Sequence, residues 1–183
     1  MSLLQCIDLF CSRELATLDI FLRNSFDTTY ASIFSDLINC CPALKDLNFF
    51  MHSRNYNESG RRAFSSVICQ WHTLRSLEVI DLTQEALKHL ATIPSLQRLS
   101  FASLKGATRS CDQRLPIGTR NPVGGYPALR SLSISYSTTE VAIAFAQLLS
   151  SSPVEDLHIS VVYHCYPPQW LELFTVQYYQ SPH

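Results

Sequence analysis

Three acidic residues of this chain stand close to large apolar residues in similar local contexts. They are Asp19, Asp46 and Glu78, which precede Phe21, Phe50 and Ile80 respectively. Carboxylates beside solvent-facing apolar anchors can bind a basic partner that also carries aromatic side chains. These residues can act together only if the elements that carry them place their side chains on one surface.

The side chains that usually perform catalysis show no such organisation. The sequence contains 6 histidines and 7 cysteines, and none of them forms a metal-ligand spacing or a C-x-x-C pair. We find no glycine-rich phosphate loop, no nucleophile elbow and no His-Glu-x-x-His helix. The sequence therefore predicts a protein that is not an enzyme and that holds no cofactor and no metal.

A short phrase recurs along the chain and indicates which elements hold the acidic residues. An apolar residue is followed by two variable residues, a leucine, one variable residue and a second apolar residue. The copies are Leu15/Leu18/Ile20, Leu44/Leu47/Phe49, Leu74/Leu77/Val79, Leu96/Leu99/Phe101, Leu129/Leu132/Ile134 and Val154/Leu157/Ile159. They begin about 28 residues apart on average, which lies in the range of stacked leucine-rich repeats.

The phrases and the segments between them have different periods. Each phrase places its last two apolar residues two apart, as in a strand with one buried face. Between phrases, helical stripes of apolar residues run over residues 3–11, 30–41, 64–71, 87–93 and 141–148. Asp27 and Thr83 can cap two of these helices, and Ser137 with Glu140 can form a capping box. We predict an α/β leucine-rich-repeat solenoid of about six repeats over residues 1–183, with a curved parallel sheet on the concave side and helices on the convex side.

Strand alternation then defines a candidate interaction surface. If the fixed apolar residues point into the core, the intervening residues lie on the concave side of the sheet, which we term the open face. The candidate partner-binding residues on it are Asp19, Phe21, Asp46, Asn48, Phe50, Glu78, Ile80, Arg98, Asp156 and His158.

Three segments depart from the repeat. Residues 105–126 contain several glycines, prolines and basic residues, and we predict a basic loop insertion in place of a helix. Residues 51–62 form a smaller predicted loop. Pro167 and Pro168 can start a final helix, with Trp170, Leu173 and Phe174 facing inward, so residues 167–183 are a candidate C-terminal cap.

Composition limits the classes of partner and compartment. Lys and Arg number 14 against 15 Asp and Glu, so no overall basic field attracts nucleic acid or anionic lipid, and no apolar run approaches a membrane-spanning length. The odd, scattered cysteines are typical of reduced core thiols. We also find no signal peptide. We therefore expect a protein partner, no nucleic acid, no membrane, and a cytoplasmic or nuclear location.

Three phrases carry a resemblance to a known family. Residues 41–47 (CPALKDL), 126–132 (YPALRSL) and 152–159 (SPVEDLHI) resemble the irregular leucine-rich repeats of F-box proteins, particularly the fungal sets. The resemblance covers residues 3–159. It implies a non-catalytic protein-protein interaction scaffold like the substrate-recognition repeats of an F-box ubiquitin-ligase subunit. No F-box precedes the first repeat in this sequence, so the resemblance does not extend to adaptor binding.

Two other interpretations are compatible with the same pattern. The repeats are also typical of an intracellular ligand-sensing or regulatory module of a multidomain receptor. Alternatively, the chain is a truncated fragment without independent function.

Overall fold

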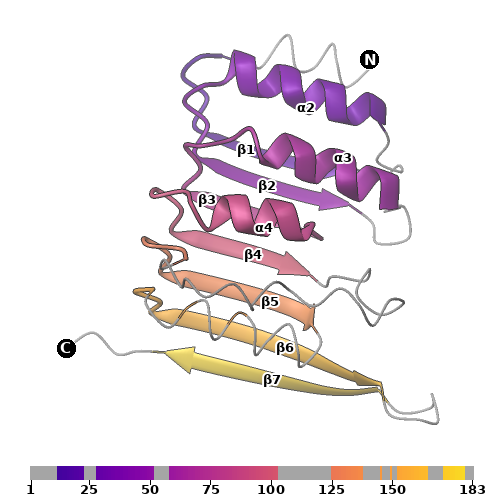
Figure 1. Ribbon diagram of the computed structural model, residues 1–183, viewed down its shortest axis with the longest axis vertical. Helices are drawn as coiled ribbons and strands as arrows, with labels where there is room; N and C mark the ends of the chain where they lie inside the picture. Colours follow the sequence, from indigo (N-terminus) through magenta and orange to yellow (C-terminus); the bar gives the residue numbers. More distant parts are fainter. Residues whose placement is uncertain are drawn as a thin grey trace.

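The fold is α/β and is dominated by one seven-stranded sheet (Figure 1). The computed structural model describes residues 12–22, 28–51, 58–102, 125–137, 145, 149, 152–164 and 171–179. The described elements in chain order are β1 (Thr17–Leu22), α2 (Thr28–Cys40), β2 (Asp46–Met51), α3 (Glu58–Ile68), β3 (Ser76–Val79), α4 (Gln84–Leu90), β4 (Arg98–Ala102), β5 (Ser131–Ser137), β6 (Asp156–His164) and β7 (Leu171–Tyr179).

The strands lie in the sheet in the order in which they occur along the chain, and β1 to β6 are parallel. The six phrases fall in register with one another. The leucine row is Leu18, Leu47, Leu77, Leu99, Leu132 and Leu157, and the second apolar row is Ile20, Phe49, Val79, Phe101, Ile134 and Ile159. The prediction of six parallel strands with aligned apolar rows is confirmed.

One backbone hydrogen-bond pattern recurs before each strand from β2 to β6. A single carbonyl oxygen, which we term a bridging carbonyl, accepts hydrogen bonds from two consecutive N–H groups of the next phrase, at 2.7 to 3.0 Å. The bridging carbonyls belong to Ala16, Lys45, Arg75, Gln97 and Arg130. Because five successive strands begin with the same pattern, the backbone repeats at the same places as the sequence phrase.

The helices α2, α3 and α4 cover one face of the sheet (Figure 1). Each places an apolar stripe toward the strands at helical spacing, as in Phe34 and Leu37 of α2 or Leu87 and Leu90 of α4, all of which are buried. Thr83 caps α4 as predicted, since its side chain accepts a hydrogen bond from the Ala86 N–H at 3.4 Å. Helix α3 begins at Glu58, so the predicted loop over residues 51–62 is wrong in its last part.

The core lies between these helices and the sheet. Three phenylalanines meet there: Phe49 of β2 stacks on Phe64 of α3, with ring centroids 4.5 Å apart, and Phe34 of α2 meets both edge-on at 5.2 and 5.5 Å. Such aromatic pairs stabilise a core beyond the area that they bury. The cluster fixes two helices against one strand.

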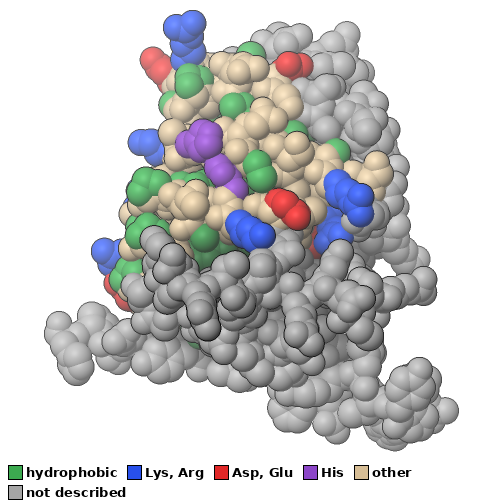
Figure 2. All heavy atoms as spheres, viewed as in Figure 1, with side chains coloured by type: hydrophobic (Ala, Val, Ile, Leu, Met, Phe, Trp, Pro, Cys, Tyr) green, Lys and Arg blue, Asp and Glu red, His purple; other side chains and the backbone are tan. Residues whose placement is uncertain are grey.

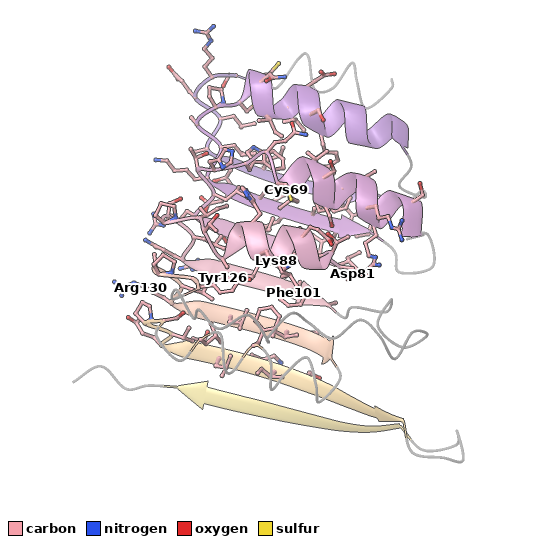
Figure 3. All side chains as sticks on the ribbon, viewed as in Figure 1. Cys69, Asp81, Lys88, Phe101, Tyr126 and Arg130 are labelled. Carbon is pink, nitrogen blue, oxygen red and sulfur yellow. The ribbon has the colours of Figure 1, made fainter. Side chains whose placement is uncertain are left out.

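A second anchor lies beside the last turn of α4. Tyr126 is 1% exposed and adopts a positive φ of 60°, which is unusual for a bulky residue. Its N–H donates to the Ala91 carbonyl and its hydroxyl donates to the Leu87 carbonyl, both at 3.0 Å. Figure 3 shows Tyr126 and Phe101 under α4, on the side of the sheet that carries the helices. Tyr126 therefore belongs to the core, although the sequence placed it at the end of the basic loop; residues 105–124 of that loop lie outside the described residues.

The C-terminal segment differs from the prediction. Residues 171–179 form β7, which pairs antiparallel with β6 along nine positions, so the predicted final helix is wrong. The segment LELFTVQYY is rich in aromatic and β-branched residues, which favour a strand over a helix. The predicted helix over residues 3–11, Asp27 and Glu140 lie outside the described residues, as does most of the helix predicted for residues 141–148.

Among the described helices, none is both long enough and apolar enough to cross a bilayer.

Candidate functional site

The open face carries three rows of side chains that run across the strands. The first row is Thr17, Asp46, Ser76, Arg98, Ser131 and Asp156, and the second is Asp19, Asn48, Glu78, Ser100, Ser133 and His158. The third row pairs Phe21 with Phe50 and Ala102 with Ser135. All of these side chains are exposed or half-buried, whereas their neighbours in the apolar rows point into the core.

Phe21 and Phe50 are the exposed large apolar residues of the described part of the chain. Their side chains are 67% and 38% exposed, and the two residues are direct partners in the β1–β2 register. Adjacent strands lie about 5 Å apart, so the two side chains leave the same face of the sheet next to each other. A paired aromatic patch on a sheet face differs from singly scattered apolar residues, which are normal on protein surfaces.

Carboxylates lie in the first and second rows, on the same face as Phe21 and Phe50, and are held by neighbouring polar groups. The Asn48 side-chain amide donates to Asp19 Oδ1 at 2.6 Å, and the Thr17 hydroxyl donates to Asp46 Oδ2 at 3.4 Å. These donors are neutral, so they orient the carboxylates without cancelling their charge. Asp19 lies two residues before Phe21 on the same face of β1, about 7 Å along the strand.

The third predicted acid-apolar pair is only partly realised. Glu78 lies in the second row, in register with Asn48, and is half-buried. Ile80 follows the last residue of β3 and packs against the hydrophobic core. The β2–β3 register ends at Phe49 and Val79, so Ile80 has no register partner in the third row, and its place on the open face stays a prediction.

The other predicted residues lie on β4 and β6, farther from the Phe21–Phe50 pair. Arg98 is exposed between Ser76 and Ser131 in the first row. Asp156 accepts a hydrogen bond from the Ser131 hydroxyl at 3.2 Å, and His158 is half-buried opposite Ser133. The structure thus groups Asp19, Phe21, Asp46, Asn48, Phe50 and Glu78 on β1 to β3, and separates Asp156 and His158 from them by two serine-bearing strands.

The helix-covered side holds one polar cluster that the sequence did not predict. The rings of His72 and His89 meet edge-on with centroids 5.0 Å apart, and His89 Nε2 lies 2.8 Å from the Trp71 carbonyl oxygen. Figure 2 shows histidine side chains gathered on this side of the molecule. The two residues are 17 positions apart in sequence and share no motif spacing, so only the fold brings them together.

The described part of the chain shows no arrangement of side chains that favours metal binding or a reactive thiol. The described residues contain no group of three or more His, Cys, Asp or Glu side chains that could hold a metal ion. Cys40, Cys41 and Cys69 are free thiols. Burial, with a smaller contribution from Glu85, raises the pKa of Cys69, which lowers its thiolate fraction and its reactivity.

Comparison of the chain with protein-family models, with curated proteins and with solved structures finds no match to any of them.

Proposed function

We propose that this chain is a leucine-rich-repeat solenoid that acts as a non-catalytic scaffold and binds a protein partner on its open face. The recurring phrase, the sequential parallel strands and the five bridging carbonyls support the repeat assignment. In such an array each unit buries its apolar residues against its neighbours. The polar and aromatic residues of the open face remain accessible to a partner.

The observation that carries the proposal is the exposed pair Phe21 and Phe50 in register on β1 and β2. Burying a large apolar side chain stabilises a contact by about 1.5 to 3 kcal/mol, so an exposed aromatic pair is a candidate energetic centre of an interface. Both rings project from strands whose opposite face is fixed by the core. A partner therefore meets a preorganised surface.

The charges beside the rings favour a partner of one kind. Asp19, Asp46 and Glu78 give this end of the open face negative charge, and Arg98 lies beyond them on β4. A peptide segment with Arg or Lys next to an aromatic residue complements this arrangement. The resemblance to F-box repeats supports the same role, since those repeats capture a substrate protein; docking to a ligase adaptor is not part of the proposal.

A displayed library of random peptides tests the proposal with a defined probe. The full chain is immobilised and peptides are selected at low salt. We expect enrichment of peptides that combine basic and aromatic residues, and weaker binding of the selected peptides as the salt concentration rises. Phe50→Ser and Asp19→Asn should each weaken binding of a selected peptide by about tenfold.

The matched control lies on the same face at the serine-bearing end. Ser133→Ala changes a half-buried residue of the second row far from Phe50 and should leave peptide binding unchanged. Enrichment of acidic peptides, or selected peptides that bind Phe50→Ser as tightly as the unmodified chain, would reject the proposed surface.

A further inference from the structure

The last strand of the sheet offers a second surface, which is made of backbone groups. Strand β7 lies at one end of the strand order, and among the described residues it pairs only with β6. Alternate N–H and C=O groups on its other side therefore form an edge that can accept a further strand. Figure 1 shows β7 at the opposite end of the sheet from α2.

The sequence of β7 does little to prevent such pairing. Natural edge strands are usually short or carry Lys, Pro or bulges that block a further strand. β7 spans nine residues, contains neither Lys nor Pro, and its register with β6 continues without a break from Leu171 to Tyr179. Glu172 is its one charged residue.

We propose that β7 pairs with β7 of a second copy of this chain, in antiparallel orientation about a two-fold axis. A two-fold contact uses the same surface on both copies and closes after two chains. With the axis at Thr175, Leu171 lies opposite Tyr179 and Glu172 lies opposite Tyr178 of the other copy. The two Glu172 residues are then far apart, so the single charge in the strand does not oppose itself.

The end of the β6–β7 hairpin provides a further reason for a second copy. Strand β5 pairs with β6 only as far as Val161, whereas β6 and β7 remain paired out to His164 and Leu171. The last positions of the hairpin thus form a two-stranded ribbon in the described structure, and isolated two-stranded ribbons are marginally stable in water. With the axis at Thr175, residues 171–173 of one copy pair with residues 177–179 of the other, so the free edge of this ribbon is covered by a strand that its own sheet supports.

Charge-swap variants at the proposed axis test the inference. Sedimentation velocity of the full chain over about 1 to 100 µM should show a monomer-dimer equilibrium. Thr175→Lys and Thr175→Glu each place like charges opposite one another and should weaken dimerisation. An equal mixture of the two variants should dimerise about tenfold more tightly than either alone.

The control Ser135→Lys changes a half-buried position of the open face on β5 and should leave dimerisation unchanged. Circular dichroism confirms that each variant is folded. Hydrogen exchange of the unmodified chain supplies a second measurement, since alternate β7 amides should become better protected as concentration rises. A monomer throughout this range, or a dimer that both Thr175 variants leave intact, overturns the proposal, and neither result bears on peptide binding at the open face.

Discussion

Tyr126 shows how one side chain can serve two structural needs. Its left-handed backbone costs about 1 to 2 kcal/mol for a residue with a Cβ atom. Its N–H donates to the Ala91 carbonyl just past the end of α4, and its hydroxyl adds a second donor to the Leu87 carbonyl, which also accepts the Ala91 N–H. The two hydrogen bonds and the burial of the ring offset the strained backbone.

We predict that Tyr126→Phe lowers the free energy of unfolding by about 1 kcal/mol at pH 7, because the Leu87 carbonyl loses a buried donor. Burial raises the pKa of Tyr126 above its usual value of about 10. Above that pH the unfolded chain releases the phenolic proton while the folded chain keeps it, so stability is complete below about pH 10 and falls as pH rises further. The phenylalanine variant lacks this loss.

Urea unfolding of both proteins at pH 7 and about pH 10.5 measures the effect. The stability difference between them should shrink at the higher pH. A difference that stays constant with pH would show that this hydroxyl does not titrate differently in the folded and unfolded chains.

At the scale of the element, β2 places two adjacent phenylalanines in opposite environments. Phe49 is 1% exposed within the aromatic cluster, and Phe50 is 38% exposed on the open face. We predict that Phe49→Ala destabilises the fold by about 3 to 5 kcal/mol, the usual cost of a large cavity in a core. Phe50→Ala should change stability by less than about 0.5 kcal/mol, as is usual at the surface.

Chemical unfolding of the two variants compares their free energies of unfolding and so tests which face of β2 lies in the core. Similar losses in the two variants would mean that the strand does not separate a core face from a solvent face.

The cap of α4 gives a smaller element-scale effect. Thr83→Ala removes the oxygen that accepts the Ala86 N–H and should cost about 1 kcal/mol, whereas Thr83→Ser keeps that oxygen and should cost less. Thermal melts followed by far-UV circular dichroism compare the two variants. Equal melting temperatures for both would show that the cap contributes no stability.

The sequence predicted the elements well where local pattern decides them. The spacing of Leu47 and Phe49 identified a strand with one buried face, and Thr83 was recognisable as a cap from its residue type and position. That β3 ends at Val79, one residue before Ile80, depends on the neighbouring strands, and a period of two does not predict such an end. The final helix predicted to start at Pro167 and Pro168 failed because spacing was given more weight than the β-propensity of Phe174 and Val176, which lie in a strand.

The candidate site was predictable to a similar degree. Alternation placed Phe21 and Phe50 on one face, and the register confirms that they are neighbours. The Asn48–Asp19 hydrogen bond and the His72–His89 contact join residues that lie far apart in the sequence. No sequence motif predicts such pairs. Contacts across units require the three-dimensional register.

On the scale of the whole molecule, burial declines toward the β1 end of the ladder. Leu47, Leu77 and Leu99 are at most 1% exposed, whereas Leu18 is half-buried. Among the described residues β1 pairs with β2 alone, so its apolar side chains have fewer neighbours than those of the inner strands.

We predict that amide hydrogens of β1 exchange faster than those of β3 and β4 in the native state, because local opening starts where burial is least. Hydrogen exchange followed by mass spectrometry of peptides from these strands measures the order. Uniform protection from β1 to β4 would indicate that the whole sheet opens as one unit.

The bridging carbonyls also determine how a chain of this kind can lengthen during evolution. The Lys45 carbonyl accepts the N–H groups of Arg75 and Ser76, just as the Ala16 carbonyl accepts those of Lys45 and Asp46. If the gene segment encoding residues 45–74 were duplicated in tandem, the inserted copy would offer the same donors at its start and the same acceptor toward its successor. Growth in whole units would thus enlarge the open face while leaving every existing junction chemically unchanged.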